Sequence, residues 1–135
     1  MKLILDTHVW YWFVIGDETL SKKTIENINQ AALNDSLYLS AISVWEVAML
    51  ENKNRIHFKI PTLQWVEQAL KEIPIQLLPL TPAIAVESCH LEDFHGDPAD
   101  RIIVATARVE NLTLLTRDKK IQYYGDQRKA EIVLA

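Results

Sequence analysis

The chain is poor in the residues that build several common kinds of site. Its one cysteine, Cys89, excludes an intrachain disulfide framework and a cysteine-rich zinc site, and we expect it to be a small core residue. Three glycines are too few for a glycine-rich phosphate loop. No serine stands in the Gly-x-Ser-x-Gly setting of a hydrolase nucleophile. The histidines lack metal-ligand spacing such as His-Glu-x-x-His; they are His8, His57, His90 and His95.

Long hydrophobic runs are also missing. The longest run, Val9–Ile15, is far shorter than the roughly 20 residues of a membrane-spanning helix. The apolar start of the chain is broken at once by Asp6, unlike a secretory signal. Apolar residues make up 49% and charged residues 24% of the 135 residues, as in an average soluble protein. We therefore expect one domain, residues 1–135, that is cytoplasmic, contacts no membrane and needs no disulfide to fold.

Net charge does not decide what the protein binds. Fourteen basic and 18 acidic side chains give a net charge of −4, which taken alone argues against nucleic acid, because phosphate binding leaves a basic footprint. If four of the carboxylates bind divalent cations, however, the rest of the chain is neutral, and the loaded site attracts phosphate.

Short apolar runs alternate with helical stretches along the chain. Strands are expected at 2–5, 37–39, 75–80, 112–115 and 132–134. Helices are expected at 7–15, 20–33, 63–73, 82–91 and 97–110, with a short turn or helix at 118–123. Another helix begins at Ser43, because Ser43 and Glu46 match a capping box. This order predicts an α/β fold, a three-layer sandwich with a mostly parallel central sheet of about five short strands.

Four acidic residues fall at corresponding places in this pattern. Asp6 directly follows the first strand and Asp118 follows the fourth, while Glu46 and Asp100 lie in the first turns of two helices. In parallel sheets the ligand crevice lies at the carboxyl ends of the strands, where the following helices also begin. We therefore expect these four carboxylates to converge at one edge of the sheet.

Each acid also has an ordinary structural explanation. Asp6, Asp97 and Asp118 could each cap a helix, and Glu46 could be the second member of its capping box. Asp100 is harder to explain in this way, because it shares the apolar face of its helix and so points inward, where a carboxylate needs a cation. If these acids were only helix caps, four of them would have to lie at one edge by chance. A shared site is the simpler interpretation.

A cluster of oxygen ligands has a definite metal preference. Without Cys or His, it favours Mg²⁺ or Mn²⁺ over zinc. In phosphodiester cleavage such ions activate a water, neutralise the phosphate and stabilise the leaving oxygen. Without metal, clustered carboxylates repel one another and their pKa values rise. Thr7, Ser43 and Thr116 are close to these acids in sequence, and their hydroxyls are candidates to orient a carboxylate.

Four segments that span nearly the whole chain carry these acids. They are Leu5-Asp6-Thr7-His8-Val9-Trp10, Ser43-Val44-Trp45-Glu46-Val47-Ala48, Asp97-Pro98-Ala99-Asp100-Arg101 and Leu114-Leu115-Thr116-Arg117-Asp118. Each segment alone is a weak signal. In this order and at about this spacing, they resemble the motifs of the PIN domain nucleases, and specifically of the VapC-type toxins.

The resemblance implies a metal-dependent endoribonuclease with four carboxylate ligands. The residues that match these ligands are Asp6, Glu46, Asp100 and Asp118. Asp97 and Thr116 match accessory positions, and Arg101 matches a neighbour that steadies a carboxylate. The resemblance also implies an RNA substrate, a homodimer and a VapB-like antitoxin that covers the active site.

Other interpretations of the same residues stay open. A phospho-acceptor receiver domain also has strand-end aspartates and Mg²⁺, but it needs further acids beside the first, where this chain has Thr7 and His8. A phosphatase of the haloacid dehalogenase type needs a second Asp at the position of His8. A PIN-fold nuclease that is not a toxin, and a non-enzymatic PIN-fold module that only binds a partner, both fit the motifs.

Overall fold

Five strands and seven helices make up the part of the chain that the computed structural model describes, residues 1–92, 94, 96–126 and 131–135. His95 lies outside the described residues. The strands are β1 (Leu3–Leu5), β2 (Leu37–Ser40), β3 (Gln76–Leu78), β4 (Thr113–Thr116) and β5 (Ile132–Leu134). The helices are α1 (Thr7–Ile15), α2 (Lys22–Leu33), α3 (Ala41–Asn52), α4 (Thr62–Glu72), α5 (Pro82–Cys89), α6 (Pro98–Val109) and α7 (Lys119–Asp126). None of these helices is both long enough and apolar enough to cross a membrane.

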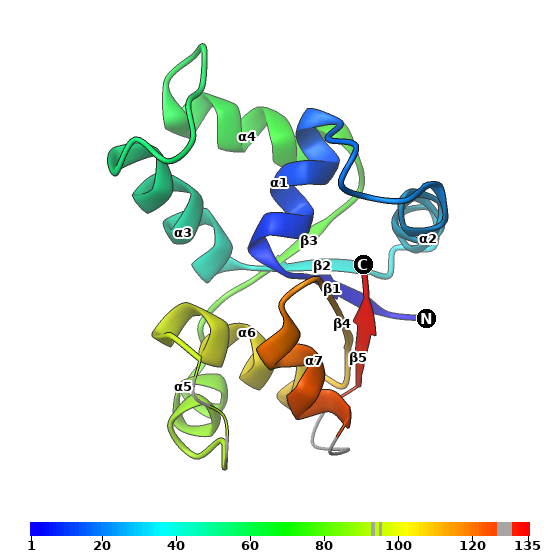
Figure 1. The fold of residues 1–135 in the computed structure, drawn as a ribbon, viewed down its shortest axis with the longest axis vertical. Coiled ribbons are helices and arrows are strands. Elements are labelled where there is room, and N and C mark those ends of the chain that lie inside the picture. Colours follow the sequence, from blue (N-terminus) through cyan, green and yellow to red (C-terminus); the bar gives the residue numbers. More distant parts are fainter. Residues whose placement is uncertain (93, 95, 127–130) are drawn as a thin grey trace.

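The strands form one sheet in the order β3-β2-β1-β4-β5, and every pairing in it is parallel. β1 is central, with Leu5 in register with Leu39 of β2 on one side and Leu115 of β4 on the other. All the strands therefore end at the same edge. Figure 1 shows the starts of α1, α3 and α6 gathered where β1 and β2 end.

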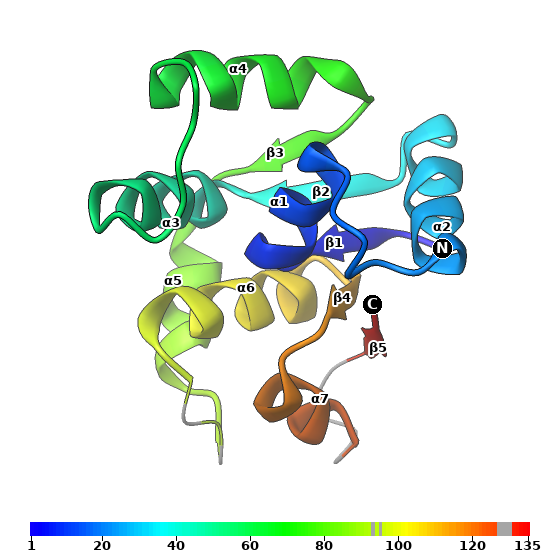
Figure 2. The same cartoon turned by 45° about the horizontal axis from the view of Figure 1, so that its top comes forward.

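Helices cover both faces of this sheet, because successive side chains of a strand point to opposite faces. Leu3 and Leu5 pack with α1, α2 and α4 in one apolar core, while Ile4 between them packs with α6 and α7 in a second core. Figure 2 shows α4 and α6 on opposite sides of the strands. Burial on both faces explains why β1 is a continuous apolar run. The predicted α/β sandwich with a parallel five-strand sheet is confirmed.

The helix that carries Glu46 begins earlier than predicted. Ser40, the last residue of β2, is its N-cap, and the Ser40 Oγ accepts a hydrogen bond from the amide of Ile42 at 3.2 Å. Ser43 therefore lies inside the first turn and Glu46 in the second turn, so the predicted capping box is wrong. The physical reason is that β2 passes directly into α3, which leaves no loop for a cap at Ser43.

Cys89 is exposed, so the prediction of a core cysteine is also wrong. It is the last residue of α5, whose buried face carries Ile84 and Ser88. A rotation of about 100° per residue turns the residue after Ser88 away from that face.

Candidate active site

Three of the acids cap helices at the edge where the strands end. Asp6 Oδ1 accepts a hydrogen bond from the first amide of α1, and Asp97 Oδ1 accepts one from the third amide of α6, both at 2.8 Å. Asp118 Oδ1 accepts from two amides at the start of α7, at 2.8 and 3.3 Å. The capping roles considered from the sequence are therefore real for these three residues. Capping is also what holds each carboxylate at this edge.

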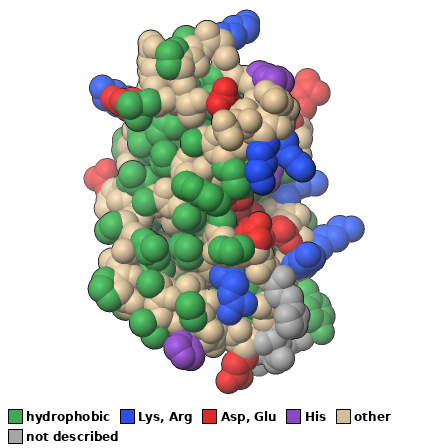
Figure 3. All heavy atoms as spheres, turned by 90° about the vertical axis from the view of Figure 1, so that its left-hand side faces the viewer, with side chains coloured by type: hydrophobic (Ala, Val, Ile, Leu, Met, Phe, Trp, Pro, Cys, Tyr) green, Lys and Arg blue, Asp and Glu red, His purple; other side chains and the backbone are tan. Residues whose placement is uncertain are grey.

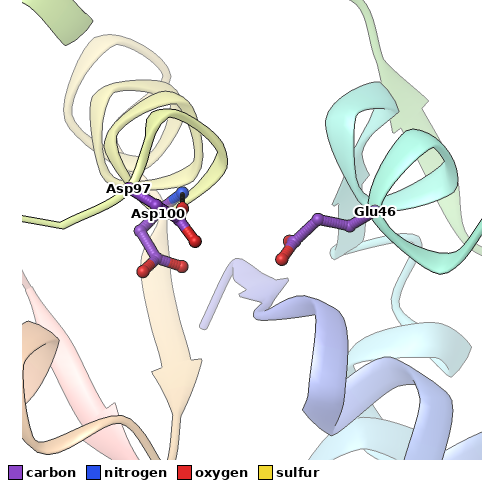
Figure 4. A group of neighbouring side chains, drawn as sticks. All are labelled: Glu46, Asp97 and Asp100. Carbon is purple, nitrogen blue, oxygen red and sulfur yellow. Dashed lines mark hydrogen bonds between the residues drawn. The ribbon is translucent and has the colours of Figure 1, made fainter. Parts of the chain in front are cut away.

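Glu46 and Asp100 are oriented differently, because both project into the space between α3 and α6. Figure 4 shows Glu46 reaching from α3 toward Asp97 and Asp100 at the start of α6. Each of these three residues offers a carboxylate oxygen, and the three oxygens lie within 4.8 Å of one another. Asp97, which matches an accessory position in the resemblance, thus belongs to the group of acids that the described residues offer as a metal site.

Thr116 connects two further acids at the same edge. It is the last residue of β4 and is completely buried. Its Oγ1 donates to Asp6 Oδ2 at 2.6 Å and accepts from the amide of Asp118 at 3.0 Å. With the α1 amide on its other oxygen, the Asp6 carboxylate has a donor on each oxygen. Its orientation is therefore fixed.

Thr7 plays the corresponding part for Glu46. The Thr7 Oγ1 lies 2.5 Å from Glu46 Oε1 and 2.8 Å from the Ser43 Oγ, and all three side chains are buried. Ser43 therefore contacts the hydroxyl that holds Glu46, one turn earlier on the same helix. These hydrogen bonds join α1 to α3 and fix the carboxylate that points across to α6.

Arg101 follows Asp100 in sequence but points elsewhere. Its Nε donates to the carbonyl oxygen of Ser88 at 2.9 Å, and its Nη1 donates to the carbonyl oxygen of Phe94. The guanidinium therefore binds backbone carbonyls and ties α5 to the segment before α6. The contact with a carboxylate that the resemblance implied is not found among the residues that the structure describes.

Burial and the negative charges of neighbouring acids raise the pKa values of Asp6, Glu46 and Asp100. Burial is the main cause for Asp6 and Glu46, which are each 7% exposed. Burial also raises the pKa of Asp100 to about 7, and the negative charges of Asp97, Asp6, Glu46 and Asp118 add to this effect. The charges of the other four acids thus all act on Asp100, although the three-oxygen group comprises only some of them. A divalent cation would relieve both causes.

The neighbourhood of the acids carries basic groups at its margin rather than in its centre. In Figure 3 acidic side chains gather near the middle of one face, with lysine, arginine and histidine side chains close by. The ion pair found in the described part of the chain, Arg108–Glu87, lies away from this group, on α6 and α5. A negatively charged centre with a basic margin suits a cation in the middle and a polyanion across it.

His8 lies beside these acids although its spacing matches no metal-binding motif. It is exposed on α1, and its charge lowers the pKa of Asp6 and of Glu46. The sequence signal for it was positional: His8 is two residues after Asp6, in the first turn of a helix that begins at the site.

Comparison with known proteins shows the family of this chain. The family described as PIN domain matches residues 3–127, a range that contains all five acids. The chain belongs to the PIN domain family. It is 34% identical to ribonuclease VapC22 of Mycobacterium tuberculosis over 131 residues, which is 96% of this chain and 97% of that protein. At this identity and coverage, the chain is a PIN domain of the VapC ribonuclease type.

Solved structures agree on the fold. DNA-bound VapBC from Salmonella typhimurium superposes with a TM-score of 0.74 at 16% identity, covering 99% of this chain and 98% of that chain. VapBC2 from Rickettsia felis, bound to a DNA fragment from its promoter, superposes with a TM-score of 0.67 at 17% identity, covering 100% and 98%. A toxin–antitoxin complex from Klebsiella pneumoniae superposes with a TM-score of 0.60 at 21% identity, covering 98% of this chain and 96% of that chain. This PIN domain therefore keeps the fold at low sequence identity.

Proposed function

We propose that this chain is a divalent-metal-dependent endoribonuclease that hydrolyses RNA phosphodiesters, and that it is the toxin of a type II toxin–antitoxin system and inhibits translation. The 34% identity to ribonuclease VapC22 over 96% of this chain supports the ribonuclease activity. The observation that carries the metal dependence is the group formed by Glu46, Asp97 and Asp100, whose oxygens lie within 4.8 Å of one another. Such a group of hard oxygen donors fits Mg²⁺ or Mn²⁺.

The proposed ligands are the four carboxylates expected from the sequence, with Asp97 in addition. They are Asp6, Glu46, Asp100 and Asp118. A bound cation would supply positive charge for the scissile phosphate and acidity for the attacking water. The chain itself holds the ligands in place, through the hydroxyl of Thr116 on Asp6 and the hydroxyl of Thr7 on Glu46.

Cleavage of total RNA by the purified protein tests this proposal. We expect discrete fragments with Mg²⁺ or Mn²⁺ that disappear in EDTA and with Asp6→Asn. Asp35→Asn is the matched control, because Asp35 is an exposed turn residue with a φ of 51°, a conformation that Asn also accepts. Equal cleavage by Asp6→Asn and wild type under the same metal would contradict the proposal.

The partners in this proposal are a small VapB-like antitoxin and a second copy of the chain. The solved neighbours named above include toxin–antitoxin complexes, which supports the first. Exposed apolar side chains on α3 and α5 support the second, with Trp45 53% and Val86 59% exposed. A denaturing gel of the native preparation would reveal a bound antitoxin, and sedimentation of the purified chain would distinguish a dimer from a monomer.

Two alternatives keep the PIN fold but change the role. A nuclease that is not a toxin would cleave RNA without arresting growth when it is expressed alone. A binding module would cleave nothing with any metal, yet it would retain its partner. Growth arrest that depends on Asp6 and is relieved by co-expression of an adjacent antitoxin gene would exclude both.

A further inference from the structure

A pocket of about 470 Å³ lies next to the acidic group, between α1 and the segment that follows α3. We call it the α1 pocket; its walls include Thr7, His8, Tyr11, Trp12, Arg55 and His57. Its volume lies in the range of roughly 300–1,000 Å³ that is usual for small-molecule sites. Thr7 is shared, because it lines the pocket and also hydrogen-bonds Glu46 at 2.5 Å. A ligand in the pocket therefore lies one side chain away from the proposed metal ligands.

The pocket presents flat aromatic surface. Tyr11 and Trp12 are half-buried, and the Trp12 ring lies 5.6 Å from that of His8, at an interplanar angle of 50°. Trp12 also packs against the core under the sheet, which limits its movement. Aromatic faces held in this way stack on nucleobases of any sequence.

The same pocket carries a cationic side chain, Arg55, and a histidine, His57, on its outer wall. Arg55 and His57 are exposed and follow α3, on the opposite side of the pocket from α1. Positively charged and aromatic side chains together are the usual combination in grooves that bind single-stranded nucleic acid. One wall residue, Asp17, is a carboxylate, and hydrogen bonds from Thr19 to its Oδ1 fix its orientation. A carboxylate can accept from the exocyclic amino group of a base.

We propose that the α1 pocket binds one unpaired base of the RNA, next to the phosphodiester at the acids, with Trp12 stacked on the base and with Arg55 and His57 on the flanking phosphates. The proposal rests on the proposed ribonuclease function and adds a subsite to it. A paired base cannot enter, because its faces are covered by its neighbours in the helix. The substrate would therefore be unpaired at this nucleotide.

Binding of short RNA without cleavage tests the pocket separately from the nuclease. A labelled hexaribonucleotide is titrated in EDTA with wild type, Trp12→Leu and Trp12→Phe, and an abasic nucleotide is moved through each position. We expect one abasic position to weaken binding to wild type about tenfold. Trp12→Leu, which keeps the apolar packing, should lose that discrimination by binding intact RNA about tenfold more weakly. Trp12→Phe, which keeps a ring, should retain most of it.

Arg55→Gln gives a second variant that does not disturb the core. We expect it to weaken RNA binding severalfold and to lower the salt dependence by about one phosphate contact. Thermal unfolding of each variant checks that it is folded; should the Trp12 variants unfold, the abasic scan on wild type decides whether a base is bound, and Arg55→Gln decides whether this pocket contacts the RNA.

The outcomes separate the pocket from the nuclease. Equal weakening of intact and abasic RNA by Trp12→Leu would mean that Trp12 is merely structural, and unchanged binding would mean that the pocket is not used. Unchanged RNA binding together with lost binding of a protein partner would assign the pocket to that partner. Each of these three results overturns the proposal. Base binding that depends on Trp12 in a protein that cleaves no RNA would instead uphold the pocket and reject the nuclease.

Discussion

Replacing Asp100 by Asn should stabilise the metal-free protein at alkaline pH. Burial raises the pKa of Asp100 to about 7, and the negative charges of four neighbouring carboxylates add to this effect. A rise from 3.8 to about 7 corresponds to about 4 kcal/mol at roughly 1.4 kcal/mol per pKa unit. The side chain is half-exposed, so solvent screening reduces this value. We expect a gain of about 1–3 kcal/mol in the free energy of unfolding.

The sign of the pH dependence follows from proton binding. The folded protein keeps a proton on Asp100 up to about pH 7, whereas the unfolded chain releases it near pH 4. Between these pH values the folded state binds more protons, so the contribution of Asp100 to stability falls as pH rises through the window. Asn binds no proton in either state. The advantage of Asp100→Asn should therefore be absent near pH 4, grow to pH 7 and stay constant above.

Urea unfolding in EDTA at pH 4.5, 6 and 8 measures this effect, with Asp35→Asn as the control that removes a charge far from the site. At pH 8, Mg²⁺ should stabilise wild type more than Asp100→Asn, because the variant has lost a proposed ligand. A variant that is less stable than wild type at pH 8, or a gain that does not change with pH, would refute the reasoning. Either result would mean that Asp100 serves the helix and not a metal.

Three other predictions concern metal binding and cleavage. The apparent affinity for Mn²⁺, measured by calorimetry, should fall about tenfold per pH unit below pH 7 as Asp100 takes up a proton; a flat profile would contradict its role as a ligand. Thr116→Val should weaken Mn²⁺ binding roughly 10–100-fold by removing the donor to Asp6, while Thr116→Ser should restore it; equal affinities for both variants would leave the hydroxyl without a role. Asp97→Asn should slow RNA cleavage less than Asp100→Asn, because Asp97 has an accessory place in the site and an Asn oxygen can still cap α6; equal reductions of the initial cleavage rate would show that Asp97 is a full ligand.

Much of the fold could be predicted because its strands are buried on both faces. Each strand is then a short apolar run, and the residue after it is free to be polar. The position of Asp6 and Asp118 at one edge of the sheet could be predicted in this way, since both follow such runs and the carboxyl ends of parallel strands share one edge. The apolar face of α6, with Ile103 and Val104 completely buried, likewise indicated where Asp100 points.

The start of α3 could not be predicted from a local rule. Ser43 and Glu46 satisfy a capping box, but Ser40 satisfies the N-cap and lies at the end of β2. The helix begins at Ala41 because β2 passes directly into α3. Glu46 in turn is paired with a residue 39 positions away, the hydroxyl of Thr7, and not with a backbone amide of its own helix. The sequence carries no signal for the α1 pocket, because Arg55 and His57 lie in a turn region whose sequence has no periodic pattern.

Capping and the proposed metal binding are compatible uses of the same acids at this edge rather than competing explanations. An aspartate that caps a helix accepts backbone amides with one oxygen, and for Asp6 and Asp97 the cap holds the carboxylate where strands end and helices begin. Helix N-termini also favour negative charge, which makes a crowded acidic edge less costly. Asp100 differs from these two residues, because Asp97 and not Asp100 is the N-cap of α6. Burial and the neighbouring charges raise the pKa of its carboxylate to about 7. The free energy that a cation would recover on binding should therefore come largely from Asp100, and replacing Asp100 should separate the capping role of these acids from the proposed metal binding.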